Sequence, residues 1–312
     1  MTTSAVEWVD IDWAGRSVRI EHQWLEPTSV QSAPTSVRPE LVEGFSRLSA
    51  ASTSSARTVE PDPPLMVFLH EGLGSLAMWK DFPKTLCDAI GCRGLVYSRP
   101  GYGRSTPRAA DEVWGPDFMH RQALEVLPAL LNALSIDTHK QALWLFGHSD
   151  GASIALLYAA HYPAQVAGAV VLAPHISVED IAVQSITQTR AAYLTTDLRQ
   201  RLSKYHDDPD SAFWGWNRIW LDPAFKAWSI EADLSRITCP VLAVQGQEDE
   251  YGTMQQLDSL KHAVPQAELL ELPACGHSPQ RDQAALLMTH VSQFFQPLTQ
   301  PLFQQQLSGD RL

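Results

Sequence analysis

Residues 142–158 read ALWLFGHSDGASIALLY and describe, in immediate succession, a strand, a sharp turn and a helix. The apolar run at the start is typical of a buried strand, and the apolar residues at the end are typical of a packed helix. Gly147 and Gly151 flank a turn that is too tight for Cβ atoms at these two points. The strained backbone of such a turn lifts the hydroxyl of Ser149 above the sheet edge, so Ser149 is a candidate nucleophile.

A serine hydroxyl is a poor nucleophile near neutral pH, and it needs a general base that a third group orients. Two downstream segments offer these groups. The apolar run 239–246 predicts a buried strand with Asp249 at its carboxyl end, and 267–273 predicts another strand whose following loop carries His277. Serine, aspartate and histidine in this chain order predict a catalytic triad at one edge of a parallel sheet.

With these residues the chain resembles the α/β-hydrolase fold family, in the serine hydrolase branch that carries a short helical cap. Two more stretches support the resemblance. FLHEGLGS at 68–75 is similar to the family's oxyanion loop, and RPGYGRS at 99–105 is similar to its glycine-rich turn. Glu71 departs from the pattern because it stands at the first glycine of the HG loop, and Ser98 stands where an acidic residue often precedes the turn.

The resemblance implies an α/β fold in which a mainly parallel sheet is flanked by helices and carries an inserted helical cap. It also implies a two-step acyl transfer in which His277 accepts the proton of Ser149 and Asp249 orients the imidazole. The backbone N–H groups of Asp150 and Gly72 are the expected donors to the oxyanion. This chemistry requires no organic cofactor and no metal ion.

Two carboxylates, Glu71 and Asp150, fall beside the expected oxyanion hole, where they would oppose a developing negative charge. Either their side chains point away into hydrogen bonds, with Arg99, Arg104 or backbone amides as partners, or they recognise part of the substrate. We favour the first alternative and keep Glu71 as a candidate substrate-binding residue.

Four further histidines lie near the predicted site or in the segment that follows the first half of the sheet. His70 and His148 flank the site, and we expect them to support its loops rather than transfer protons. His175 and His206 fall in the predicted cap, where a lone histidine is more often solvated or hydrogen-bonded than catalytic.

Along the rest of the chain, strands alternate with helices, which indicates a mainly parallel sheet that is covered on both faces. Residues 6–12 and 17–25 alternate apolar and polar side chains and predict an antiparallel hairpin at one edge of the sheet. Apolar residues at helical spacing predict helices over 79–90, 117–134 and 281–295.

Residues 28–62 contain 8 Ser and 4 Thr, a single aromatic residue and no sustained period. We expect a disordered insertion there, and part of it resembles the read-through of short palindromic repeats that invade bacterial genes. The chain then divides into N-terminal core strands at 1–27, this insertion at 28–62, the first part of the core at 63–174, a helical cap at 175–237, the second part of the core at 238–296 and a frayed C-terminal tail at 297–312.

The predicted cap is rich in aromatic residues, namely Phe213, Trp214, Trp216, Trp220, Phe225 and Trp228. Most buried aromatic side chains serve packing, but we expect some of these to face the cavity. Trp214, Trp216 and Trp220 are the candidate substrate-binding residues. Because pockets of this kind are mostly apolar, the substrate is expected to be a small molecule with an apolar or aromatic portion.

The composition excludes several other classes of function. A net charge of −12 and a pI near 5.3 argue against nucleic acid or an anionic membrane as a partner. The four cysteines show no metal-ligand spacing, no secretion signal opens the chain, and no apolar run reaches membrane-spanning length. We therefore expect a cytoplasmic enzyme; the sequence leaves its oligomeric state open.

Three functions remain after these exclusions. The first is hydrolysis of a small-molecule carboxylic ester or lactone. The second is hydrolysis of a carbon–carbon bond in aromatic ring-cleavage products, which would suit an aromatic cap. The third is a non-catalytic binding module, which an intact set of Ser149, Asp249 and His277 disfavours. Serine at the turn also argues against the haloalkane dehalogenase and epoxide hydrolase branches, which use an aspartate nucleophile.

Overall fold

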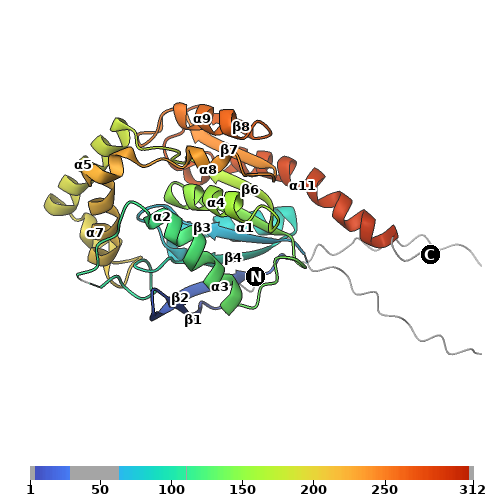
Figure 1. Ribbon diagram of the computed structural model, residues 1–312, viewed down its shortest axis with the longest axis horizontal. Coiled ribbons are helices and arrows are strands. Elements are labelled where there is room, and N and C mark those ends of the chain that lie inside the picture. Colours follow the sequence, from blue (N-terminus) through green and yellow to red (C-terminus); the bar gives the residue numbers. More distant parts are fainter. Residues whose placement is uncertain (1–3, 29–62, 110, 309–312) are drawn as a thin grey trace, which may run out of the picture.

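The computed structural model describes residues 4–28, 63–109 and 111–308, with side chains up to Gln296. The predicted insertion at 28–62 lies, apart from Thr28, outside the described residues. The chain forms one sheet in the order β1-β2-β4-β3-β5-β6-β7-β8 (Figure 1). Its strands are β1 (Glu7–Trp13), β2 (Arg16–Leu25), β3 (Leu65–Leu69), β4 (Arg93–Tyr97), β5 (Leu143–His148), β6 (Val166–Leu172), β7 (Val241–Gly246) and β8 (Glu268–Leu272).

The edge formed by β1 and β2 is the predicted antiparallel hairpin. Its two-residue turn has positive φ at both Ala14 (54°) and Gly15 (71°), which is the geometry that matches the twist of paired strands. Trp13 pairs with Arg16 directly across the turn. From β4 to β8 every neighbouring pair is parallel, so the prediction of a mainly parallel sheet with helices is confirmed.

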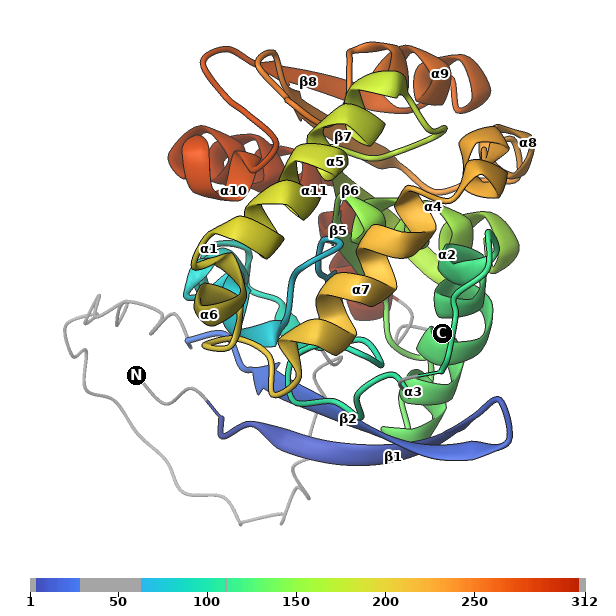
Figure 2. The same cartoon turned by 90° about the vertical axis from the view of Figure 1, so that its left-hand side faces the viewer.

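Both faces of the parallel strands are buried, which explains their continuous apolar runs. Successive side chains of β3 point to opposite faces, so Val67 joins one hydrophobic core and Phe68 joins the other. The first core includes residues of α3 (Leu127–Ala133) and α4 (Asp150–His161), and the second includes residues of α1 (Phe82–Ile90) and α11 (Ala284–Ser308). Figures 1 and 2 show these two layers of helices on either side of the sheet.

Two helices that were predicted as continuous are divided into segments of different helix type. The helix expected over 79–90 is divided into a 3-10 turn η1 (Leu76–Trp79) and α1, because Pro83 can occupy only the first turn of a helix. The helix expected over 117–134 consists of α2 (Phe118–Arg121), a π-helical segment η2 (Gln122–Val126) and α3. Pro128 lacks a backbone N–H group, and the wider turn lies just before it.

The C-terminal end also differs from the prediction. A closing helix was expected over 281–295 with a frayed tail from 297, but a short helix α10 (Pro279–Asp282) precedes α11, which continues to Ser308. Glutamine and leucine are good helix formers, and they dominate this part of the chain. Helix α9 (Gln255–Ala263) lies between the last two strands.

The segment between β6 and β7 forms the inserted helical cap. It contains α5 (Asp180–Thr195), α6 (Leu198–Leu202), α7 (Pro209–Trp220), η3 (Pro223–Ala227) and α8 (Glu231–Leu234). Figure 2 shows α5 and α7 side by side in front of the strands, and the rings of Tyr193 and Phe213 stack between them at 3.6 Å. A bridge between Ser177 and Ser229 closes the base of the cap.

One buried histidine fastens the cap to the loops of the core. His206 accepts a hydrogen bond at Nδ1 from the backbone N–H of Gly103 (2.9 Å), and its Nε2 lies 3.0 Å from the carbonyl oxygen of Leu73. A carbonyl oxygen only accepts, so Nε2 is the donor. His206 is thus hydrogen-bonded, which is one of the two states expected for it, and it links the cap to the loops that follow β3 and β4.

Candidate active site

The turn between β5 and α4 holds Ser149 in a strained conformation with φ of 54° and ψ of −120°. A Cβ atom on Gly147 would lie 2.3 Å from the carbonyl oxygen of Gly151, and one on Gly151 would lie 2.1 Å from that of Leu69. Both contacts are shorter than any real Cβ atom tolerates, so glycine is required at each position. The backbone strain at a non-glycine residue is the kind that accumulates at functional sites.

The structure brings the three predicted triad residues into one hydrogen-bonded chain. The Nε2 atom of His277 lies 2.9 Å from the Oγ atom of Ser149, and its Nδ1 atom lies 2.8 Å and 3.0 Å from the two carboxylate oxygens of Asp249. Ser149 follows β5, Asp249 follows β7 and His277 follows β8, so the parallel sheet delivers all three to one edge.

Asp249 is held in its ionised form by its surroundings. Burial raises its pKa, but the hydrogen bond to His277 and the charge of that imidazole outweigh burial and leave the pKa below its ordinary value. The backbone N–H groups of Tyr251 and Gly252 donate to the same carboxylate, at 2.8 Å and 3.2 Å. An ionised Asp249 accepts from Nδ1–H, which leaves the lone pair on Nε2 of His277 directed at Ser149.

The loop after β3 carries Gly72 and is fastened by two buried side chains. Arg99 donates from Nη2 to the carbonyl oxygen of Glu71 (2.8 Å), and its backbone N–H donates to Nε2 of His70 (3.1 Å). Burial, assisted by the charge of Arg99, lowers the pKa of His70 well below its ordinary value. His70 therefore supports the loop as a neutral ring. Within the described residues, the backbone N–H groups of Gly72 and Asp150 donate to no acceptor.

Most of the chain matches a known family. The family model described as "Alpha/beta hydrolase family" matches residues 66–288, which is most of the chain. The chain belongs to the alpha/beta hydrolase family.

Proteins that are similar to the chain carry names of different activities. The chain is 23% identical over 248 residues to a 2-hydroxy-6-oxo-6-phenylhexa-2,4-dienoate hydrolase of Burkholderia cepacia, which covers 70% of this chain and 83% of that protein. Its fold is similar to that of a proline iminopeptidase from Mycobacterium smegmatis, with a TM-score of 0.65, 15% identity and coverage of 95% and 100% of the two chains. It is also similar to a thermophilic esterase from Thermogutta terrifontis, with a TM-score of 0.62, 14% identity and coverage of 95% and 99%.

A second histidine, His175, lies close to Ser149, and its position in the sequence predicted a place in the cap. Nε2 of His175 lies 3.4 Å from Oγ of Ser149, and the side chain is buried. Burial, followed by the charge of His277, lowers the pKa of His175 to about 3. His175 is therefore not solvated; it is the hydrogen-bonded alternative of the two that were expected, and its partner is Ser149. His175 stands just past the carboxyl end of β6, and the same signal that placed Asp249 could have found it.

Asp150 directs its carboxylate away from solvent into hydrogen-bonding groups. Its Oδ1 atom accepts from the indole N–H of Trp220 (3.1 Å), and its Oδ2 atom lies 4.0 Å from Nη2 of Arg99. Burial raises its pKa to about 6, an effect that the charge of Arg99 and the bond from Trp220 only partly offset. Arg99 was one of the expected partners for the two carboxylates; Arg104, the other arginine considered, is exposed.

Glu71 contacts His148, the residue that precedes Ser149. Its Oε2 atom lies 3.4 Å from Nδ1 of His148, whose Nε2 atom lies 2.7 Å from the carbonyl oxygen of His277. The amide of Gln280 approaches the same Nδ1 atom at 3.0 Å. These contacts join the loop after β3, the turn at Ser149 and the loop that carries His277.

The three tryptophans of α7 that were candidates for substrate binding occupy different surroundings. A Cβ atom on Gly72 would lie 2.2 Å from Nε1 of Trp216, so that ring covers the loop after β3. The ring of Trp220 packs edge-on against His175 at 4.8 Å. Trp214 instead lies beneath the guanidinium groups of Arg190 and Arg218, at 5.7 Å and 5.4 Å.

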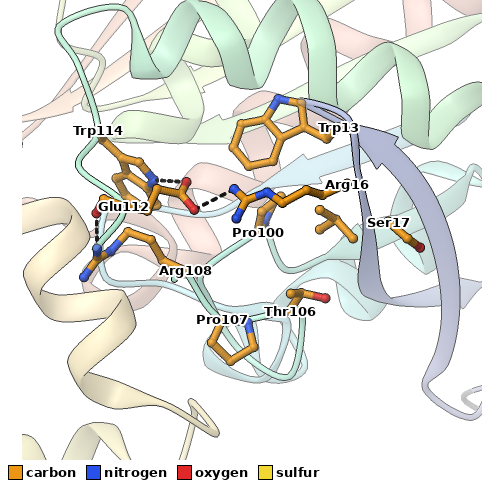
Figure 3. A pocket seen from close by; sticks show the side chains of 11 residues that line it. Trp13, Arg16, Ser17, Pro100, Thr106, Pro107, Arg108, Glu112 and Trp114 are labelled. Carbon is orange, nitrogen blue, oxygen red and sulfur yellow. Dashed lines mark hydrogen bonds and ion pairs between the residues drawn. The ribbon is translucent and has the colours of Figure 1, made fainter. Parts of the chain in front are cut away.

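Two hollows on the described surface differ in their relation to the site. A cavity of about 60 Å³ lies at the hairpin, where Glu112 pairs with Arg16 at 2.8 Å and accepts from the indole of Trp114 (Figure 3). That volume is below the range of small-molecule sites. A groove of about 450 Å³ is lined by Glu71 and Ser278, the chain neighbours of Gly72 and His277. The groove therefore ends beside the site.

Across residues 4–28, 63–109 and 111–308, no group of three or more His, Cys, Asp or Glu residues is arranged to hold a metal ion. Nor does any helix in these ranges have the length and apolar character that crossing a membrane requires.

Proposed function

We propose that this protein hydrolyses a small-molecule carboxylic ester or lactone through an acyl-enzyme on Ser149. The observation that carries the proposal is the hydrogen-bonded chain from Oγ of Ser149 to Nε2 of His277 (2.9 Å) and from Nδ1 of His277 to Asp249 (2.8 Å). Both distances lie within the reach that proton transfer from a nucleophile to a base requires.

In this mechanism, Oγ of Ser149 attacks the carbonyl carbon while Nε2 of His277 takes its proton, and Asp249 stabilises the resulting imidazolium. The N–H groups of Gly72 and Asp150 would donate to the oxyanion, each worth about 3 kcal/mol in comparable sites. The imidazolium then gives its proton to the leaving alkoxide. In the second step His277 takes a proton from a water molecule as its oxygen attacks the acyl carbon. The imidazolium then returns that proton to Oγ of Ser149 as the bond between Oγ and the acyl carbon breaks and the acid leaves.

Two histidines approach Ser149, and their surroundings decide which is the base. His277 has a carboxylate on its far nitrogen, which fixes the tautomer and stabilises the protonated ring. His175 has a lowered pKa, and its Nδ1 atom is buried with no partner among the described residues. A ring that resists protonation is a poor proton acceptor, so we assign the base to His277.

The cap favours a substrate with an apolar or aromatic portion. Trp216 and Trp220 are one helical turn apart on α7, and they contact Gly72 and His175, which adjoin the reacting centre. Residues four apart lie on one face of a helix. We therefore assign Trp216 and Trp220 to the substrate side of the cap and Trp214 to its outer packing.

A panel of p-nitrophenyl esters, from acetyl to long and aromatic acyl groups, tests the proposal. We expect turnover that depends on acyl size and is abolished in Ser149→Ala, whose circular dichroism should match that of the wild type. Equal release of p-nitrophenol by the wild type and Ser149→Ala would contradict the proposal.

Hydrolysis of a carbon–carbon bond is the second candidate. It is favoured by the 23% identity to a hydrolase named for 2-hydroxy-6-oxo-6-phenylhexa-2,4-dienoate. The same triad and aromatic cap would serve this reaction. The loss of the visible absorbance of that compound, compared in the wild type and Ser149→Ala, distinguishes the two candidates when the ester panel shows no turnover.

A further inference from the structure

His148 is buried immediately before the nucleophile, with one per cent of its surface exposed. Its Nε2 atom lies 2.7 Å from the backbone carbonyl oxygen of His277. A carbonyl oxygen only accepts hydrogen bonds, so Nε2 of His148 carries a proton and donates it. This bond ties the residue before Ser149 to the loop that carries the base.

The other ring nitrogen of His148 faces two groups. Nδ1 lies 3.4 Å from the Oε2 atom of Glu71 and 3.0 Å from the side-chain amide of Gln280. If Nδ1 carried no proton, its lone pair would be directed at a carboxylate oxygen, which is a repulsive contact. A proton on Nδ1 makes that contact attractive.

The amide of Gln280 supports a proton on Nδ1. In the structure, the amide nitrogen of Gln280 faces His148. Its Oε1 atom is buried and has no hydrogen-bond partner among the described residues. The two ends of a glutamine amide are nearly indistinguishable in shape, and their assignment follows from the hydrogen-bond network. Exchanging them directs Oε1 at Nδ1–H of His148, so the buried oxygen gains a donor.

The charge on Glu71 is consistent with this arrangement. Partial burial raises the pKa of Glu71, but the hydrogen bond and the charge of His148 outweigh it and lower the pKa to about 2. The other titratable rings that face His148 are those of His277, at 5.2 Å between centroids, and His175, which interacts with it electrostatically. Glu71 is therefore the carboxylate in direct contact with His148.

We propose that His148 is a positioning residue that carries both ring protons, pairs with Glu71 and holds the loop of the base His277 against the turn at Ser149. The pairing gives Glu71 a cationic partner, so its charge no longer opposes an oxyanion formed at Gly72. The kinetic part of this inference rests on the proposed hydrolytic function, whereas the protonation of His148 does not.

The groove beside the site gives this buried pair access to solvent. Glu71 and Gln280 both line the groove, whose volume is about 450 Å³, and a quarter of the Glu71 side chain is exposed. Protons can therefore exchange with bulk water through Glu71 although His148 is covered.

Two variants test the positioning role: one removes the carboxylate of Glu71, and the other also introduces a carboxylate at position 280. We expect Glu71→Gln to lower kcat/KM by roughly 10- to 100-fold, because a displaced base costs rate steeply. Because Gln280 approaches the same nitrogen, the double variant Glu71→Gln/Gln280→Glu should regain most of the activity. Glu248→Gln, which removes an exposed carboxylate from the Asp249 loop, is the matched control.

Absence of rescue in the double variant, or wild-type kinetics in Glu71→Gln, would overturn the positioning role. Nitrogen-15 NMR of the His148 ring tests its charge without any substrate. We expect two protonated ring nitrogens at pH 7 in the wild type and a shift toward the neutral ring in Glu71→Gln. A neutral His148 in the wild type would overturn the inference. Wild-type protein that shows this imidazolium but no hydrolysis would instead contradict the proposed function alone.

Discussion

Two histidine–carboxylate pairs lie within one site and have different surroundings. In the pair His277–Asp249 the atoms approach to 2.8 Å, the carboxylate is the buried member, and the free nitrogen faces Ser149. In the pair His148–Glu71 the atoms lie 3.4 Å apart, the histidine is the buried member, and the second nitrogen is bound to a carbonyl oxygen. One pair has a nitrogen available for proton transfer, whereas the other has both nitrogens engaged.

The difference shows that a histidine paired with a carboxylate through one ring nitrogen can act as a base only if its other ring nitrogen is free to accept a proton. A third carboxylate, Asp150, extends the comparison because no histidine pairs with it. The pKa values of Asp249 and Glu71 are lowered despite burial, whereas that of Asp150 is raised to about 6. The two carboxylates with a lowered pKa thus have a histidine partner, and the one with a raised pKa has none.

We expect the largest effect on catalysis when the His277–Asp249 pair is broken. Asp249→Asn keeps the shape of the side chain but no longer favours the tautomer with the proton on Nδ1 of His277, and we expect kcat to fall by about 10⁴-fold. Ester hydrolysis at substrate saturation measures the effect, with the melting temperature as the control for folding. A loss no greater than that of Glu71→Gln would mean that the two pairs do not differ as described.

Asp150→Asn should change how stability depends on pH. The folded state raises the pKa of Asp150, so it binds the proton more tightly than the unfolded chain. The stability from this group is therefore present below the unfolded pKa of about 4 and is lost as pH rises through about 6. Relative to wild type, the free energy of unfolding of Asp150→Asn should rise by on the order of 2 kcal/mol between about pH 4 and pH 7.

Urea unfolding at a series of pH values measures this difference directly. The control is Asp222→Asn, an exposed carboxylate that caps η3 outside the site. Parallel pH profiles for the wild type and Asp150→Asn would contradict the raised pKa and would remove the contrast between paired and unpaired carboxylates.

The smallest effect on catalysis is expected for His175, which approaches Ser149 but has no carboxylate partner. Because His175 remains neutral near pH 7, His175→Asn should lower kcat/KM by no more than about 10-fold, which corresponds to about 1.4 kcal/mol. His277→Asn is the matched substitution at the same hydroxyl and should be far more damaging. Comparable losses in both variants would show that the two histidines share the role of base.

Much of the fold and the positions of the triad could be predicted from the sequence, because both depend on local patterns. Glycines with no room for a Cβ atom mark the turn at Ser149, and apolar runs mark the strands that carry Asp249 and His277 to one edge. The contact between Glu71 and His148 joins residues that are 77 positions apart, and no local pattern encodes it.

Two other features could have been inferred from sequence and were not. His175 follows the end of a buried strand, the same position that identified Asp249. Trp216 and Trp220 are spaced four residues apart, so they share a helical face from which Trp214 points away. Composition alone does not separate the three tryptophans, whereas their spacing places Trp214 on a different helical face from the other two.

The central claim is that Ser149 is a nucleophile activated by His277, and covalent labelling with a fluorophosphonate tests it most directly. We expect mass spectrometry to find one adduct, on Ser149, in the wild type and almost none in His277→Asn over the same time. Folded wild-type protein that remains unlabelled, or that carries its adduct on another residue, would contradict the account.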